Sequence, residues 1–445
     1  MKTPICDFVN KYSNDNKIRL HMPGHKGKSF LGLEHLDITE VDGADSLYEA
    51  NGIIAQSERN ASELFGCRTY YSTEGSSQCI KAMLHLLSLD AKSKGQTPYI
   101  WAGRNAHKAF HSAIALLDVD VDWIFAEDAQ SYLSYFIDVN ELTKAIKQAK
   151  RKPTAIYLTS PDYLGYIADI ESIAKVCHEN GVLLAVDNAH GAYLRFLEKS
   201  LHPIDLGADI CCDSAHKTLP VLTGGAYLHL NDVLSEKFDN ECVKDALLLF
   251  GSTSPSYLIL QSLDMANKYL EAYQSELACF IKKVEDVMLE LSNHGYELYG
   301  SEPLKITINT KAYGYIGEQF KDIMLENGVV CEFTDRDFVV MMLTPEISKK
   351  DLNKLLSVLL SIPKKEVIRE KSPQFSKLER RLSIREAILS NSEHIPVNES
   401  VGRVVAMPSV GCPPAVPIAV AGEIIDENAL DCFAYYGINN INVIK

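Results

Sequence analysis

The chain has 445 residues, of which 46% are hydrophobic and 23% are charged, and these values are ordinary for a globular protein with two or three domains. The formal net charge of −15 argues against nucleic acid as a partner, because proteins that bind nucleic acid usually carry a basic surface. No apolar stretch is long enough to cross a bilayer and no signal peptide is present, so we expect no membrane association and a cytoplasmic location. The 11 cysteines lack metal-type spacing, which predicts reduced thiols and no bound metal.

Strand-like and helix-like segments alternate between residues 51 and 230. The expected strands are Tyr99–Ala102, Asp122–Phe125, Ala155–Thr159, Val182–Val186 and Ile210–Cys212. The expected helices are Ser76–Ser88, Lys108–Leu117, Val139–Lys150 and Ile170–Glu179. This β/α alternation predicts a mainly parallel sheet that is covered by helices on both faces and binds its ligand at the carboxyl ends of the strands.

The second half of the chain has a different pattern. The pattern predicts a long helical stretch over residues 257–294 and a smaller α+β domain over residues 304–365, with strands at Lys305–Ile308 and Phe338–Leu343. Residues 376–393 are charged and amphipathic, which predicts another helix. We therefore expect an N-terminal arm, a large α/β domain, a small α+β domain and a C-terminal domain, at residues 1–50, 51–265, 266–365 and 366–445.

An acidic and a basic residue follow two of the expected strands. Asp187 comes directly after the run Val182–Val186, and Lys217 lies just beyond the run Ile210–Cys212. A lysine amine can form a Schiff base with the aldehyde of pyridoxal phosphate (PLP), and a carboxylate can keep the pyridine nitrogen protonated, which makes the ring an electron sink. Each residue alone has an ordinary interpretation, since an Asp often caps a turn and most lysines are solvated. Their positions at two strand ends favour PLP chemistry.

Hydroxyl and imidazole side chains occur at further strand-to-helix junctions. Ser76 and Ser77 begin an expected helix, where backbone N–H groups favour a phosphate, although Ser is also an ordinary helix cap. His107 could stack on the pyridine ring or lie at the surface as a cap. Ser214 and His216, which precede the lysine, could contact the phosphate.

Several sequence blocks resemble, in order, the ornithine/lysine/arginine decarboxylase family of fold type I PLP enzymes. They are His21–Gly27, Asp37–Glu40 with Asp45–Leu47, Arg104–Lys108, Ser160–Gly165, Asp187–Gly191, Ser214–Lys217, Ser252–Tyr257, Gly402–Val404, Pro413–Pro417 and Gly422–Glu423. The blocks after residue 400 resemble a C-terminal domain that fold type I enzymes in general do not share. The resemblance is to the short form, and it implies an aspartate-aminotransferase-like fold and a homodimer or dimer of dimers with its active site at the subunit interface.

The resemblance also implies a role for each candidate residue. Lys217 would hold PLP, Asp187 would contact the ring nitrogen, and His107 and Ala189 would pack on the two faces of the ring. The phosphate would be surrounded by Ser76, Ser77, Ser214 and His216, with Thr253 or Ser254 supplied by a second subunit. From the residues alone, Thr253 and Ser254 could equally cap the following helix.

The activity implied by the resemblance is α-decarboxylation of arginine, lysine or ornithine, as in polyamine biosynthesis, to give agmatine, cadaverine or putrescine and carbon dioxide. Lys217, Asp187, His107 and His216 are the expected catalytic residues, and either Lys217 or His216 would return a proton to Cα. The substrate's distal cation requires an acid, for which Glu423 is the first candidate, with Asp45 and Glu40 behind it, and His190 is a further candidate for substrate binding. Glu423 could instead be an exposed turn residue.

Two alternative functions stay open at this point. A different PLP reaction on the same fold, such as transamination, would place an arginine on the substrate carboxylate, and Arg336 and Arg403 are the arginines to check. A PLP-binding protein without catalytic activity is the other alternative. The chain also departs from the family pattern, with Asn188 where Glu is more common and Gly411-Cys412 before the proline pair, and these departures leave the substrate open.

Overall fold

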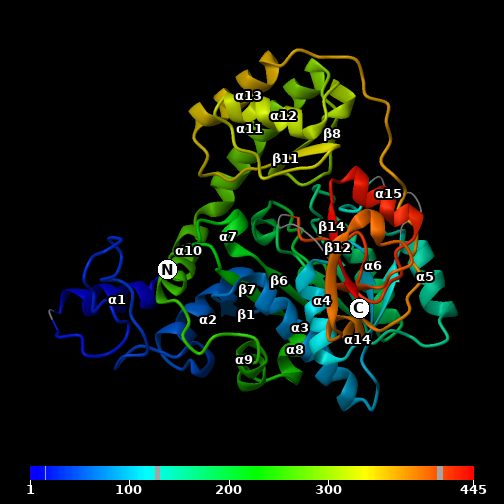
Figure 1. Ribbon diagram of the computed structural model, residues 1–445. Coiled ribbons are helices and arrows are strands. Elements are labelled where there is room, and N and C mark those ends of the chain that lie inside the picture. Colours follow the sequence, from blue (N-terminus) through cyan, green and yellow to red (C-terminus); the bar gives the residue numbers. More distant parts are fainter. Residues whose placement is uncertain (16, 126–130, 408–413) are drawn as a thin grey trace. The chain divides into compact units, whose positions relative to one another are not determined.

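The computed structural model describes residues 1–15, 17–125, 131–407 and 414–445. It divides into two compact units, of which the first contains residues 1–97 and 170–277 and the second contains residues 98–169 and 278–445 (Figure 1). The four-domain division expected from the sequence stays a prediction. The departure at Gly411-Cys412, together with Pro413, lies outside the described residues. Among the described residues, no helix combines the length and the apolar character that crossing a membrane requires.

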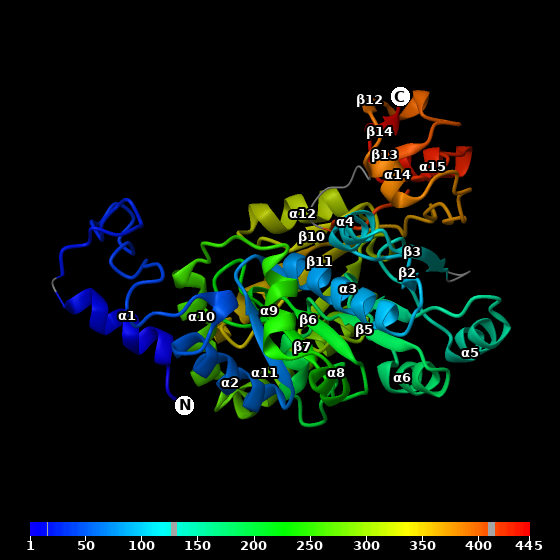
Figure 2. The ribbon, with the colours of Figure 1, turned by 90° about the horizontal axis from the view of Figure 1, so that it is seen from below.

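The first unit contains a group of four strands and most of the N-terminal helices (Figure 2). Its helices are α1 (Pro4–Asn14), η1 (Leu47–Glu49), α2 (Ile53–Phe65), α3 (Gly75–Ser93), α6 (Ile170–Glu179), η2 (Ala192–Phe196), α7 (Ala215–Thr218), α8 (Asp232–Lys237), α9 (Asn240–Leu248) and α10 (Tyr257–Leu270). Its strands, in spatial order, are β1 (Arg68–Ser72), β7 (Ala226–Leu230), β6 (Ile210–Asp213) and β5 (Leu183–Asp187). β5 and β6 are parallel, whereas β7 runs antiparallel to both β6 and β1.

The second unit contains three groups of strands. Three parallel strands lie in the order β4 (Ala155–Thr159), β2 (Tyr99–Gly103) and β3 (Asp120–Ile124). An antiparallel sheet has the order β10 (Phe333–Thr334), β11 (Phe338–Met342), β9 (Lys305–Asn309) and β8 (Leu298–Tyr299). A C-terminal sheet has the order β12 (Ser392–Pro396), β14 (Asn440–Ile444) and β13 (Val405–Met407).

Nine further helices complete the described part of this unit. They are α4 (Lys108–Leu117), α5 (Val139–Gln148), α11 (Tyr273–His294, which begins in the first unit), η3 (Lys311–Tyr313), α12 (Gly317–Glu326), α13 (Lys349–Ser361), α14 (Ile384–Ile388), η4 (Val397–Glu399) and α15 (Glu427–Tyr435).

Most of the predicted elements are confirmed. α4, α6 and β4 have the predicted bounds, and the other predicted strands and helices before residue 230 differ only at their ends. The long helical stretch at 257–294 is divided into α10 and α11 by a turn. β1 and β7 were not predicted. The strand pairs β5–β6, β2–β3 and β2–β4 are parallel, which confirms the expected character of the sheet.

The helix predicted over residues 376–393 is wrong, because only α14 (Ile384–Ile388) is helical there. The backbone of Arg380 instead forms an antiparallel bridge with Glu423. A capping box that begins with Ser383 then starts the short helix. Amphipathic periodicity is a local signal, and in this segment it is overridden by pairing with a distant part of the chain.

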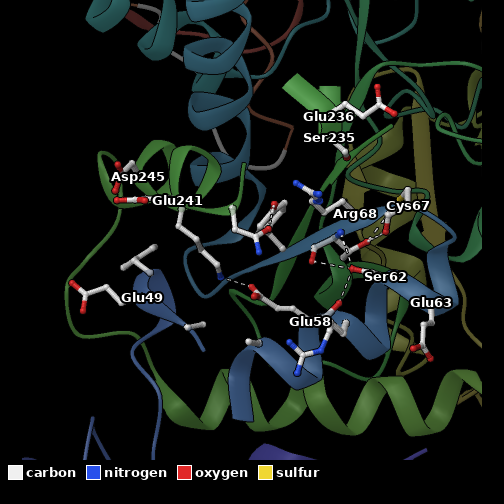
Figure 3. A pocket seen from close by; sticks show the side chains of 18 of the residues that line it. Glu49, Glu58, Ser62, Glu63, Cys67, Arg68, Ser235, Glu236, Glu241 and Asp245 are labelled. Atoms are coloured by element: carbon white, nitrogen blue, oxygen red, sulfur yellow. Dashed lines mark hydrogen bonds and ion pairs between the residues drawn. The ribbon is translucent and has the colours of Figure 1, made fainter. Parts of the chain in front are cut away.

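A cavity of about 1110 Å³ lies in the first unit, with α2, β1 and α9 contributing to its wall (Figure 3). A buried ion pair joins Lys244 on α9 to Glu58 on α2, with 2.5 Å between Nζ and Oε1. Tyr71 also donates its backbone N–H to Glu58 Oε1, at 2.9 Å. Burial raises the pKa of Glu58, an effect that the neighbouring Lys244 opposes. The charge on Glu58 therefore depends on its lysine partner.

Substituting Lys244→Met is expected to lower the free energy of unfolding by about 3–5 kcal/mol, because buried Glu58 would lose the cation that offsets its desolvation. Urea denaturation at pH 7 measures this change. Lys144→Met is the control, since it removes an exposed lysine that pairs with Glu141 and should change stability little. An unfolding free energy for Lys244→Met as high as that of the control would contradict the importance of the buried pair.

Candidate functional site

The carboxyl ends of β5 and β6 carry the acid and the lysine that the sequence analysis singled out. Asp187 is the last residue of β5 and pairs in register with Cys212 of β6. Lys217 follows β6 in the four-residue helix α7. Because β5 and β6 are parallel, their carboxyl ends lie at the same edge of the sheet, where α/β proteins bind their ligands.

The amine of Lys217 lies against a histidine from the loop after β5. Lys217 Nζ is 2.9 Å from His190 Nε2. His190 is buried and Lys217 is partly buried. An amine at this distance from an imidazole can exchange a proton with it. The structure thus brings the predicted lysine together with a predicted substrate-binding residue.

Asp187 is buried and its carboxylate closes the turn after β5. Its Oδ1 accepts the backbone N–H of Ala189 at 3.2 Å and the thiol of Cys212 at 3.7 Å. The first of these bonds is the turn contact that the alternative interpretation predicts. A further role toward the pyridine nitrogen, with Ala189 against the ring, stays a prediction.

The hydroxyl groups expected around a phosphate meet at the start of α3. Ser214 Oγ donates to Ser76 Oγ at 2.8 Å. The backbone N–H of Gly75 donates to the carbonyl of Gly224 at 2.7 Å, which ties the start of α3 to the loop after α7. Ser77 lies in the same first turn of the helix. N–H groups and the positive end of a helix dipole favour an anion at such a position.

His216 contacts the same loop through its ring. Its Nδ1 lies 3.0 Å from the carbonyl oxygen of Gly225, so this nitrogen carries the proton and donates it. Burial lowers the pKa of His216, and the ring is therefore neutral at pH 7. A neutral ring with its N–H bonded to the backbone is a weak acid.

Thr253 and Ser254 lie on an exposed loop. The preceding residue, Ser252, donates its backbone N–H to Glu74 Oε1 at 2.5 Å. Glu74 is the N-cap of α3, so this loop lies beside the start of α3 in its own chain. The helix α10, which they could have capped, is capped by Ser256 instead.

His107 lies in the second unit, where it is the N-cap of α4. Its Nδ1 accepts the backbone N–H of Ala109 at 3.1 Å. The alternative interpretation of this residue predicts such a capping contact, and stacking on the ring stays a prediction.

Two of the carboxylates expected to receive the substrate's distal cation, Glu423 and Asp45, are both engaged by groups of the chain itself. Glu423 is buried, and its Oε2 lies 3.2 Å from Arg104 Nη2 and accepts the backbone N–H of Val420 at 2.7 Å. Asp45 is also buried and accepts the backbone N–H of Gly52 before α2. Arg104 thus already supplies the buried carboxylate of Glu423 with a cation. The geometry gives these two assignments no support, and they stay predictions.

Substituting Glu423→Gln separates a structural role from a role in substrate binding. We expect the KM for the amino acid to stay unchanged and the free energy of unfolding to fall by about 3 kcal/mol, because buried Arg104 would lose its counter-ion. Steady-state kinetics and urea denaturation on the same preparation measure the two quantities. A raised KM with undiminished stability would place Glu423 in the substrate site.

A further buried acid, which has no role in the sequence-based predictions, lies at the end of β6, directly before Ser214. Asp213 is the last residue of β6, and its carboxylate contacts the side chains of His202, His229 and Asn188. The one available signal in the sequence was its place directly before Ser214. Its partners come from distant segments, so no local pattern could reveal them.

A model of the Orn/Lys/Arg decarboxylase major domain matches residues 3–288, which is more than half of the chain. The chain therefore belongs to the Orn/Lys/Arg decarboxylase family. The arginine decarboxylase of Bacillus subtilis (strain 168) is 28% identical to this decarboxylase, over 96% of this chain and 92% of the relative. The lysine decarboxylase LdcA of Pseudomonas aeruginosa is 24% identical over 60% of this chain and 40% of the relative.

Solved structures show the same fold. Lysine decarboxylase A from Pseudomonas aeruginosa matches this decarboxylase with a TM-score of 0.83 and 18% identity, over 99% of this chain and 80% of that chain. The constitutive lysine decarboxylase of E. coli matches with a TM-score of 0.76 and 18% identity, over 100% of this chain and 82% of that chain. The predicted fold type I architecture is thereby confirmed.

The residues at this edge of the sheet fit PLP. They offer an amine at Lys217, a buried carboxylate at Asp187, and two hydroxyls in hydrogen-bond contact at the start of α3, at Ser76 and Ser214. An amine suits the aldehyde of PLP, and hydroxyls at a helix start suit its phosphate. Family membership and this donor set agree, and the chain is a PLP-dependent decarboxylase, as predicted.

Proposed function

We propose that this decarboxylase removes the α-carboxyl group of arginine and releases agmatine and carbon dioxide. The observation that carries the choice of substrate is the 28% identity, over 96% of the chain, to a relative named arginine decarboxylase. The relative named lysine decarboxylase is less similar and aligns with only 60% of the chain. Lysine and ornithine are the alternatives within the same class of basic amino acids.

The cofactor would be held by residues at the ends of β5 and β6 and at the start of α3. Lys217 would bind the aldehyde carbon, Asp187 the ring nitrogen, and Ala189 and His107 the two faces of the ring. The phosphate would be bound by Ser76, Ser77, Ser214 and His216. When bound, PLP accepts the electron pair that remains on Cα as carbon dioxide departs.

Lys217 returns the proton to Cα. Its Nζ is 2.9 Å from His190 Nε2, which can resupply the amine with a proton after each turnover. The other candidate donor, His216, has its Nδ1–H bonded to the carbonyl of Gly225, and burial lowers its pKa. These contacts support Lys217 over His216 as the donor.

The two arginines to check for a transaminase carboxylate site are paired with acids. Arg336 lies 3.1 Å through Nε and 3.0 Å through Nη2 from Glu370 Oε2. Arg403 Nη2 lies 2.6 Å from Glu393 Oε1. A decarboxylase should leave the substrate carboxylate without such a clamp, because that group must depart. The pairing of these two arginines therefore supports decarboxylation over transamination.

The same proposal includes the assembly and the cellular setting. The proposal includes a homodimer or dimer of dimers, in which the exposed loop with Thr253 and Ser254 would lie at the subunit interface. A cytoplasmic location is supported by the cysteines, since those that the structure describes are all unpaired. Because agmatine is a precursor of polyamines, we assign the proposed reaction to polyamine biosynthesis.

Product analysis tests the proposal. The purified holoenzyme is incubated separately with arginine, lysine and ornithine, and agmatine, cadaverine and putrescine are measured by chromatography. Agmatine should form with the highest kcat/KM. Preferential formation of cadaverine or putrescine would overturn the choice of arginine. Absence of all three amines, with PLP bound, would overturn the class of substrate.

A further inference from the structure

We propose that Asp213 is a positioning residue that, through Asn188, fixes the strand ends carrying Asp187 and Lys217 relative to each other. This inference rests on the proposed roles of Asp187 and Lys217 in holding PLP. Asp213 ends β6 and precedes the segment with Lys217, whereas Asn188 directly follows Asp187 at the end of β5. The carboxylate would act on the reaction only through these neighbours.

The link between the two strands is a side-chain hydrogen bond. Asn188 Nδ2 donates to Asp213 Oδ1 at 2.7 Å, and both side chains are buried. The backbone N–H of Asn188 also donates to the carbonyl of Cys212 at 3.0 Å, which brings the two strand ends together beyond the last paired residues. Gly191 leaves room for this amide, since a Cβ there would lie 2.0 Å from Asn188 Oδ1.

Two histidines hold the other oxygen of the same carboxylate. Asp213 Oδ2 lies 3.2 Å from His202 Nε2 and 3.1 Å from His229 Nε2, and none of the three side chains is exposed. Because an ionised carboxylate only accepts hydrogen bonds, the ring of His229 carries its proton on Nε2, toward Asp213, and its Nδ1 lies 2.9 Å from the hydroxyl of Thr69. The carboxylate therefore receives three donors from separate segments of the chain.

The surroundings of Asp213 favour one negative charge, which its own carboxylate carries. The neighbouring histidines lower the pKa of Asp213 despite its burial, so the carboxylate is ionised. Burial lowers the pKa of His229, which keeps that ring a neutral donor. Position 188 carries an amide, and a second carboxylate there would repel Asp213 at hydrogen-bond distance. The amide instead makes the contact attractive.

The hydrogen bonds of Asp213 with Asn188, His202 and His229 lie close in the chain to the residues proposed to hold PLP. We therefore expect them to affect catalysis as well as stability. Ser214, which follows Asp213, contacts Ser76 at the start of α3, and Lys217 follows three residues later. A shift of the β6 end would thus move both the amine and a phosphate ligand. Small displacements of reacting groups can reduce a rate by about 10²-fold.

The first variant is Asn188→Ala, which removes the link and leaves the two histidine contacts of Asp213 in place. We expect kcat to fall about 10- to 100-fold with little change in KM. We also expect the visible absorbance of bound PLP to titrate at a different pH, because the environment of the lysine changes. The double variant Asn188→Asp with Asp213→Asn exchanges the two side chains, so that one carboxylate again faces one amide. It should regain much of the kcat that Asn188→Ala loses.

The matched control is Asn231→Ala in the same unit. Asn231 Nδ2 donates to Asp209 Oδ1 at 3.0 Å, and Asp209 immediately precedes β6, at the end of that strand away from Lys217. Asn231 also caps α8, so this variant should lose stability and keep its kcat. If Asn188→Ala keeps its kcat and its absorbance titration as the control does, the positioning role is overturned.

Two further outcomes distinguish a failure of the positioning role of Asp213 from a failure of the proposed function. One equivalent of tightly bound zinc in the purified enzyme would overturn it, because His202, Cys211 and Asp213 could then be metal ligands rather than hydrogen-bonded partners. If the unsubstituted enzyme binds PLP but releases no amine, the proposed function fails. The absorbance titration of Asn188→Ala still decides the positioning role in that case.

Discussion

Substituting Lys217→Ala is expected to abolish the visible absorbance of covalently held PLP and to reduce amine formation by on the order of 10⁴-fold or more. The reason is that, in the proposed function, Lys217 supplies both the amine that holds the cofactor and the proton that returns to Cα. Lys217 is partly buried beside His190, and the backbone of its helix does not depend on the amine, so the fold should persist. Absorbance spectra and the product assay on the same preparation measure the two effects.

Lys268→Ala is the control for this experiment, because Lys268 is an exposed residue of α10 in the same unit. It should keep both the absorbance and the activity of the unsubstituted enzyme. Circular dichroism establishes that each variant is folded. A Lys217→Ala variant that still forms amine at a comparable rate would show that another residue is the catalytic lysine.

Removing the charge of Asp187 should have the next largest effect. We expect Asp187→Asn to lower kcat by about 10²- to 10³-fold, because the pyridine nitrogen would lose the anion that keeps it protonated. The asparagine oxygen can still accept the backbone N–H of Ala189, so the turn after β5 and the stability of the fold should be kept. Asp187→Ala removes both contacts, and should weaken PLP binding in addition.

The two substitutions together separate the competing interpretations of this carboxylate. If Asp187 only closes a turn, Asp187→Asn will have nearly normal kcat and only Asp187→Ala will be impaired. If it acts on the ring, both variants will be slow while PLP stays bound to the asparagine variant. Cofactor content, measured from the absorbance of released PLP, accompanies each rate.

Much of the fold could be predicted because its signals are local. The bounds of α4, α6 and β4 follow from hydrophobic periodicity, and parallel pairing follows from the alternation of strands and helices. The strand ends then placed Asp187 and Lys217 at one edge of the sheet. The resemblance to a family added the reaction class, which periodicity alone does not contain.

The features that were missed depend on contacts between distant segments. The segment near Arg380 pairs with Glu423 instead of forming a helix, and Glu423 itself is neutralised by Arg104, far from it in the sequence. The network around Asp213 likewise draws on His202 and His229, which no spacing rule connects. Charge and amphipathicity in the sequence show where polar groups occur. Which of these groups form hydrogen bonds or ion pairs with each other depends on how the chain folds.

The most direct test of the central claim is the reaction of the purified holoenzyme with arginine in deuterium oxide, with carbon dioxide and organic product measured together. A PLP-dependent decarboxylase should release carbon dioxide and agmatine in equal amounts, with one deuterium on the former Cα, because the proton that replaces the carboxyl group comes from an exchangeable group such as the Lys217 amine. Formation of a keto acid without carbon dioxide would show transamination and would contradict the account.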